Sequence, residues 1–284
     1  MNQELKKIFS PLRIDMMISN GYLFQPIEVF SESLRSIAAD KGRLFLPFLI
    51  FVVIGDLLAQ VGVWAQFLVN LVLDPVLLIY VFSKFFSKTL GKTFHFASLL
   101  KEKWLKLIGF NLVYYIIMLL VLSPLLFALW NYRVLDKIIG GDTDITEALT
   151  AIPEQIHWVF ILNFIVLVYM VISYWWSTIL LVFFDYSIKD SFLNGHLLVN
   201  KSLSRHINLA MFVVLLFFLI QILVVQFASL GDNALRIVSL LGLSVLNLYF
   251  YTIIYTAFKL SYFQNIRIKI KRAAPSGDSD KKLD

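Results

Sequence analysis

Long apolar segments constrain this chain more than any other feature of its sequence. A membrane-spanning helix needs about 20 predominantly apolar residues, and six segments of the 284-residue sequence come close to that length or exceed it. The chain is 59% hydrophobic and only 15% charged, which leaves too little polar surface for a soluble protein of this size. The sequence therefore predicts an all-α polytopic membrane protein with one transmembrane domain over residues 1–272. The expected spans are residues 44–62, 64–82, 106–130, 157–184, 207–230 and 236–260.

The first two expected spans belong to one apolar stretch, Leu44–Phe86. We divide it near Gln60–Gln66, because its length fits two crossings joined by a tight turn. One tilted helix followed by a surface helix is the alternative. A five-span arrangement would scatter the basic residues over both sides of the membrane, so we prefer six spans.

The basic residues lie almost entirely on one side of these six spans. Of the 25 Lys and Arg residues, 22 lie before the first span, after the sixth, between spans two and three or four and five, or, for Lys106 and Lys259, at the adjoining ends of spans three and six. The exceptions are Arg133, Lys137 and Arg236. Basic segments tend to stay in the cytoplasm because they resist translocation. We therefore expect both termini in the cytoplasm, with residues 273–284 forming a disordered polar tail.

Three cytoplasmic segments that lead into odd-numbered spans are basic and amphipathic, namely Phe24–Arg43, Thr93–Lys106 and Lys189–His206. Such segments are typical of helices that lie in the membrane interface. The chain can be interpreted as three units of surface helix plus transmembrane hairpin, although inner loops near membranes commonly share this composition. We expect anionic lipid headgroups as partners of these segments. The basic side chains expected to contact them are Lys41, Arg43, Lys101, Lys103, Lys106, Lys201 and Arg205.

Two acidic residues, Asp56 and Asp74, fall inside expected spans. A charge at the bilayer centre costs about 2.5–3.5 kcal/mol on insertion scales, so intramembrane carboxylates often mark functional sites. A proton-coupled or cation site between the first two spans is one interpretation, with Asp56, Asp74, Asn70 and Arg236 as its candidate residues. The other is structural: Asp74 caps a helix broken at Pro75, and Asp56 lies near the outer surface.

Amides within the spans, including Asn111 and Asn163, either line a polar pathway or tie helices together. The structural interpretation is the commoner one for such residues. Ser173 and Ser177 have the spacing of a close helix contact. Pro124 is expected to kink the third span, and the carbonyl group that it frees should find a neighbour.

The sequence offers no catalytic, nucleotide-binding or metal-binding motif. It has no cysteine, which excludes disulfides and thiolate metal sites. Its four histidines do not form a ligand set, since His95, His196 and His206 are expected at the inner interface and His157 at the outer edge of a span. We therefore expect no cofactor, no metal site and no enzymatic activity. Nucleic acid is not an expected partner, because the basic residues flank spans.

The stretch Leu180–Phe218 reads LLVFFDYSIKDSFLNGHLLVNKSLSRHINLAMFVVLLFF. It resembles the YciC-type six-span bacterial inner-membrane proteins and the membrane domain attached to some glycerophosphoryl diester phosphodiesterases. In that pattern a span ends in an acidic residue, followed by a serine, a basic amphipathic helix and the next span. Asp185, Ser191, Lys201 and Arg205 occupy these places, whereas the proline often found before the acidic residue is absent. The resemblance implies a multi-pass protein of the bacterial inner membrane.

Three functions remain open at this stage. The first is a non-enzymatic integral membrane protein, such as an envelope-homeostasis or accessory component. The second is a small transporter or channel subunit for lipidic or small amphipathic solutes. The third is a membrane enzyme that acts on lipid headgroups through Asp185, Asp190 and His196.

Overall fold

The computed structural model describes residues 8–40, 43–59, 61–91, 94–132, 152–226 and 232–264. These residues form helices and no strand, which confirms the expected all-helical class for the described part of the chain. The elements are α2 (Pro11–Asn20), α3 (Pro26–Ala39), α4 (Phe45–Ala59), α5 (Val63–Leu90), α6 (Phe96–Asn131), α9 (Glu154–Phe183), α10 (Ile188–Lys201), α11 (Leu203–Gln226), α12 (Asp232–Lys259) and the π-helical turn η2 (Leu260–Gln264).

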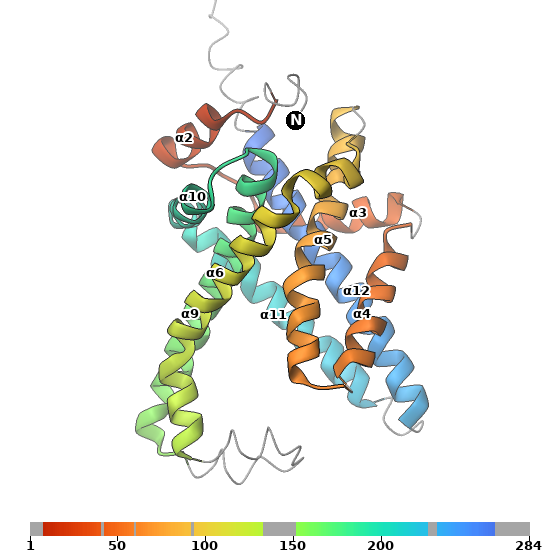
Figure 1. Ribbon diagram of the computed structural model, residues 1–284, viewed down its shortest axis with the longest axis vertical. Coiled ribbons are helices and arrows are strands. Elements are labelled where there is room, and N and C mark those ends of the chain that lie inside the picture. Colours follow the sequence, from red (N-terminus) through yellow and green to blue (C-terminus); the bar gives the residue numbers. More distant parts are fainter. Residues whose placement is uncertain are drawn as a thin grey trace, which may run out of the picture.

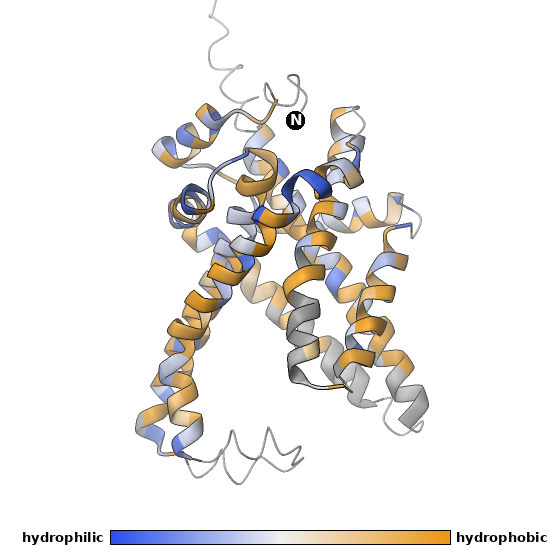
Figure 2. Cartoon of the chain, in the orientation of Figure 1, coloured by the Kyte–Doolittle hydropathy of each residue, from blue (hydrophilic) through white to orange (hydrophobic). Residues whose placement is uncertain are grey.

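Short helices gather at one end of the molecule, and long helices extend away from them (Figure 1). At that end α3 lies across the long axis and α10 is seen nearly end-on. The pair formed by α6 and α9 diverges toward the opposite end from the group of α4, α5, α11 and α12. Figure 2 shows hydrophobic residues along the long helices and many of the hydrophilic residues at the end with the short helices.

Three helices of the described residues are long enough and apolar enough to cross a membrane. They cover Phe96–Asn131, Ile156–Phe183 and Ile237–Phe263, and they coincide with the expected third, fourth and sixth spans. Side chains of α6 and α9 remain widely exposed, among them Leu120, Phe127 and Leu162. Exposed apolar surface of this extent marks a face that meets lipid or another protein. These observations support the expected class of membrane protein, and helices of sufficient length and apolar character lie at three of the expected spans.

The stretch Leu44–Phe86 contains two helices, as expected, because α4 ends at Ala59 and α5 begins at Val63. They pack against each other on either side of a turn that contains Gly62. Gly62 has a φ of 147°, a conformation that side-chain-bearing residues rarely adopt. The 15 residues of α4 span only about 22 Å, which is shorter than a typical hydrocarbon core.

Two sequence expectations are wrong. The helix is not broken at Pro75, since α5 continues through it from Val63 to Leu90, so Asp74 does not cap a helix there. The segment Thr93–Lys106 is not a separate surface helix, because α6 runs without interruption from Phe96 to Asn131. By contrast, α3 and α10 are separate short helices at the expected places. The three expected units are therefore not equivalent.

The two prolines inside long helices show why those helices need not break. A proline lacks the N–H group that would bond the carbonyl four residues earlier. For Pro75 that carbonyl belongs to Leu71, and it accepts a 2.7 Å hydrogen bond from the side-chain amide of Asn111 on α6. For Pro124 it belongs to Leu120, which accepts a 2.7 Å bond from the Ser123 hydroxyl. Both freed carbonyls are satisfied, as was expected for Pro124.

An aromatic core joins the two ends of the described chain. Phe9 packs against Phe86, Phe183 and Tyr262. The Tyr262 hydroxyl accepts a 3.1 Å hydrogen bond from the Ser10 amide and donates a 2.7 Å bond to the Ile8 carbonyl. Residues 8–10 and 262 therefore lie at the same end of the molecule.

Candidate functional site

The four residues predicted for an intramembrane polar site lie on three mutually packed helices, Asp56 on α4, Asn70 and Asp74 on α5, and Arg236 on α12. Asp56 is half-buried. The side chains of Asn70, Asp74 and Arg236 lie outside the described part of the structure.

Backbone positions separate the two acidic residues in depth. Asp56 lies three residues before the end of α4, about 4–5 Å along its axis, whereas Asp74 lies eleven residues into α5, about 16 Å from the same end. Arg236 lies four residues into α12, about 6 Å from its start. Figure 1 shows these three helix ends on the same side of the molecule. Asp56 and Arg236 thus lie near these helix ends, whereas Asp74 lies several turns from the start of α5, which does not favour one site for both carboxylates.

A second candidate site is an apolar cavity of about 170 Å³ between α9, α11 and α12. One end is closed by buried side chains, including Trp176, His206 and Ala257. Toward the other end the lining residues are only half-buried, among them Leu167, Val213 and Phe250. The cavity therefore opens to the surroundings along part of its length.

The closed end is built around His206, whose side chain is almost completely buried. The Trp176 indole N–H donates a 2.8 Å hydrogen bond to Nε2 of His206, so Nε2 must accept. Nδ1 lies 3.0 Å from the Ser202 carbonyl oxygen, which can only accept, so Nδ1 carries the proton. This assigns a neutral imidazole with both nitrogens engaged inside the protein.

The segment between α2 and α3 covers the His206 end of the cavity. The carbonyl of Tyr22 accepts hydrogen bonds from the Ser202 hydroxyl at 2.6 Å and from Nη1 of Arg205 at 3.0 Å. The Tyr22 hydroxyl donates a 2.8 Å bond to the Leu198 carbonyl. The Phe24 ring packs edge-on against His206. The closed end is therefore tied to the segment between α2 and α3 and lies at the end of the molecule where the short helices gather.

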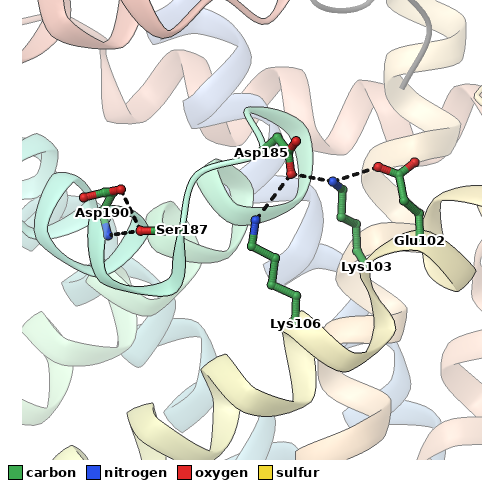
Figure 3. A network of polar contacts seen from close by, with 6 residues as sticks. All are labelled: Glu102, Lys103, Lys106, Asp185, Ser187 and Asp190. Carbon is green, nitrogen blue, oxygen red and sulfur yellow. Dashed lines mark hydrogen bonds and ion pairs between the residues drawn. The ribbon is translucent and has the colours of Figure 1, made fainter.

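An ion-pair cluster at the same end connects α6 with the loop after α9 (Figure 3). Oδ1 of Asp185 lies 2.6 Å from Nζ of Lys103 and 3.3 Å from Nζ of Lys106, and Lys103 also pairs with Glu102 at 2.8 Å. The hydrogen bond from Lys103 holds the pKa of Asp185 below its usual range. Asp185 has a φ of +60°, a left-handed conformation that Asp tolerates better than most residues. The cluster ties the first turns of α6 to the loop that follows α9.

The predicted headgroup contacts differ in their exposure. Arg43, Lys101 and Lys201 are exposed, which is compatible with lipid contact, and Lys41 lies outside the described residues. The prediction that Lys103 contacts a lipid headgroup is wrong, because its side chain is only 4% exposed and pairs with two carboxylates. Two further predicted contacts are partly occupied within the protein, Lys106 by Asp185 and Arg205 by the Tyr22 carbonyl.

The three residues considered for catalysis on lipid headgroups, Asp185, Asp190 and His196, each contact a different partner. Asp185 pairs with lysines, and Asp190 accepts a 2.6 Å hydrogen bond from Ser187, the N-cap of α10. His196 lies 3.1 Å from the Tyr169 hydroxyl through Nδ1. Over the described ranges, no group of three or more His, Asp or Glu side chains could hold a metal ion.

No protein-family model, curated protein or solved structure matches this chain.

Sequence reasoning missed His206 and Trp176 as cavity residues. His206 was expected at the interface, yet it is core. The signal was present in the spacing of His206, Leu209 and Val213, which recur every three or four residues and share one face of α11. The basic residues just before His206 pointed to an interfacial segment instead, so this buried face was not recognised.

Proposed function

We propose that this chain is a six-span protein of the bacterial inner membrane, with both termini in the cytoplasm, that works without covalent chemistry as an envelope-homeostasis or accessory component. The observation that carries the topology is the hydrogen bonding of Ser10 and Ile8 to Tyr262, because it places both ends of the described chain together. The excess of basic residues around that end supports a cytoplasmic position for it.

The short helices at this end are suited to a membrane surface. Each exposes apolar residues beside polar ones: Leu12 and Met16 on α2, Ile27 and Leu34 on α3, and Leu193 and Leu197 on α10. Exposed apolar side chains on such helices can enter the headgroup region, while exposed lysines meet anionic lipid. An interfacial layer of this kind supports the expected partnership with anionic lipids.

Transport of lipidic or small amphipathic solutes is the second candidate function. The apolar cavity between α9, α11 and α12 favours it, since it lies among helices proposed to be spans and opens on one side. A polar pathway through Asp56 and Asp74 is less favoured because of their different depths.

Reporter fusions test the topology. Alkaline phosphatase, which is active only outside the cytoplasm, is fused after Gly62, Gly141 or Asn194. The six-span arrangement requires activity after Gly62 and Gly141 and none after Asn194. A green fluorescent protein fused at the same positions is the control and should give the reverse pattern. An inactive Gly62 fusion would show that α4 does not cross, and an active Asn194 fusion would contradict the proposed orientation.

A further inference from the structure

We propose that the cavity between α9, α11 and α12 binds the methyl end of a lipid acyl chain, which enters from the bilayer centre while its headgroup lies in the outer leaflet. This inference rests on the proposed six-span placement and adds a specific ligand site to it. The ligand is hydrocarbon, and no headgroup takes part in its recognition.

The mouth of the cavity lies near the middle of the helices that line it. The lining is only half-buried at Leu167 on α9, Val213 on α11 and Phe250 on α12. Leu167 lies thirteen residues after the start of α9, about 20 Å along its axis, and Val213 lies thirteen residues before the end of α11. Half of a hydrocarbon core is about 15 Å thick. In the proposed topology the mouth therefore opens toward the bilayer centre, where the chains of both leaflets end.

The closed end excludes a lipid that enters from the cytoplasmic surface. Trp176, His206 and Ala257 are buried there. The segment between α2 and α3 covers them, with the Tyr22 ring centroid 5.5 Å from that of Trp176 and the Phe24 centroid 5.2 Å from that of His206. A chain of an inner-leaflet lipid would have to turn back at the bilayer centre to reach the mouth. A chain of an outer-leaflet lipid reaches it in its ordinary direction.

Apolar surface leads from the outer half of the membrane to the mouth. Phe164 lies one turn before Leu167 and Val168 on the same face of α9, and it is 47% exposed. On α12, Leu246 lies one turn before Phe250 on the same face and is half-buried. Toward that end of the molecule, α6 and α9 diverge from the group that contains α11 and α12 (Figure 1). The apolar lining thus continues outward as a surface along which a chain can lie.

The chemistry and the size of the cavity suit the end of a hydrocarbon chain. Among the described lining residues His206 is the one titratable side chain, and Trp176 and Ser202 engage its two ring nitrogens. A polar ligand would lose its water without gaining a partner there, which is unfavourable. A dry apolar cavity of about 150 Å³ is large enough to bind benzene. The observed volume of about 170 Å³ therefore accommodates the last carbons of one chain and not a whole lipid.

Photolabelling of the full-length protein in phosphatidylcholine vesicles tests the site. Two phosphatidylcholine probes are compared, one with a diazirine at the methyl end of an acyl chain and one with the diazirine beside the carbonyl group. Labelled residues are mapped by mass spectrometry. We expect the chain-end probe to label the lining side chains Ile172, Leu209 and Ile254, which are buried from bulk lipid, and the carbonyl-proximal probe to leave them unlabelled. Phosphatidylglycerol probes should give the same map, because no headgroup is recognised.

Leu120 is the control for bulk lipid, since it is exposed and lies eleven residues before the end of α6, at a depth similar to that of the mouth. The chain-end probe should label it whether or not the cavity is occupied. Two valine variants supply the matched comparison. Val213→Trp obstructs the mouth and should remove most of the cavity labelling, whereas Val113→Trp on the exposed face of α6 should leave it unchanged. The comparison of the two probes on the wild-type protein does not depend on how these variants fold.

Leaflet-selective labelling tests the origin of the chain. Lipid exchange delivers the chain-end probe to the outer leaflet of spheroplasts and to the inner leaflet of inverted membrane vesicles. Relative to Leu120, the cavity should be labelled more strongly in spheroplasts. Equal or reversed labelling would overturn the assignment to the outer leaflet.

The outcomes separate this inference from the membrane placement on which it rests. Unlabelled Ile172, Leu209 and Ile254 beside a labelled Leu120 would overturn the inference alone. Equal labelling of the cavity by both probes would contradict entry by the chain end. An unlabelled Leu120 would instead contradict the proposed membrane placement.

Discussion

At the residue scale, Asn111 shows how one buried amide can hold three helices. Its Nδ2 group donates to the Leu71 carbonyl on α5, and its Oδ1 atom accepts a 2.9 Å bond from the Tyr174 hydroxyl on α9. The Leu71 carbonyl is the one that Pro75 leaves unpaired, so the amide and the proline form a matched pair on different helices. Asn111 thus ties helices together, as one interpretation of the sequence held for these amides.

We expect Asn111→Leu to destabilise the protein by about 1–3 kcal/mol, because it leaves a buried carbonyl without a partner. Thermal unfolding in detergent measures the effect. Asn163→Leu is the matched control, since Asn163 is also buried and, within the described part of the chain, its side chain bonds to the Val159 carbonyl of its own helix. Pro75→Ala restores the backbone N–H group that can bond the Leu71 carbonyl. In that background Asn111→Leu should therefore lower the free energy of unfolding by less. An equal cost in both backgrounds would contradict the pairing.

Asp185 gives a second prediction at this scale. Lys103 lowers the pKa of Asp185, so the folded protein keeps this carboxylate charged more readily than the unfolded chain does. The pair therefore stabilises the fold above the usual carboxyl pKa of about 4, and this contribution disappears as pH falls through the lowered value.

Asp185→Asn should cost roughly 1 kcal/mol at neutral pH, a modest amount because Asp185 is half exposed and Glu102 still pairs with Lys103. Asn tolerates the left-handed backbone, so the substitution isolates the charge. The difference in unfolding temperature between wild type and variant should shrink as the pH falls toward about 3. A difference that stays constant with pH would show that the charge is not its cause.

At the element scale, the crossing of α9 and α10 depends on small side chains. A Cβ atom placed on Gly195 would lie 2.0 Å from Oγ of Ser177 and 2.9 Å from its backbone nitrogen. Of the two serines with close-packing spacing, Ser177 lies at this contact, and its partner is a glycine on the next helix.

We expect Gly195→Ala to destabilise the protein by about 1–3 kcal/mol through overpacking, although alanine favours helix in isolation. Ser177→Gly should rescue it only in part, since the backbone contact remains. Gly55→Ala on α4 is the control, because nothing lies within 4 Å of the added carbon and a neutral or stabilising effect follows. The unfolding temperatures of the three variants are compared. Equal effects of Gly195→Ala and Gly55→Ala would contradict the close contact between α9 and α10.

The sequence predicted elements better than it predicted their contacts. Among the described residues, a helix lies at each of the six expected spans, and three of these helices are long and apolar enough to cross a membrane. Hydrophobicity and length could be predicted because they are local properties. Pro75 misled the prediction because the partner of its freed carbonyl, Asn111, is 36 positions away in the chain. Lys103 and His206 were both expected at the interface, yet tertiary contacts bury them against Asp185 and Trp176. The pairing of Lys103 with Asp185 and of His206 with Trp176 joins segments far apart in the sequence and has no local signal, so these pairs required the structure.

At the scale of the whole molecule, the basic end should respond to lipid charge through its exposed residues only. Arg43, Lys101 and Lys201 are exposed there, whereas Lys103 is buried in an ion pair. An exposed cation near an anionic surface gains about 1 kcal/mol, and salt screens that attraction.

We therefore expect the protein to unfold at a higher temperature in phosphatidylglycerol-containing nanodiscs than in phosphatidylcholine nanodiscs, and added salt should narrow this difference. Replacing Arg43, Lys101 and Lys201 together by Gln should also narrow it. Lys103→Gln is the control, and it should lower stability equally in both lipids, because its partner is a carboxylate of the protein and not a headgroup. If Lys103→Gln narrowed the lipid difference as much as the triple variant, the division between buried and exposed basic residues would fail as an account of how this end meets the membrane.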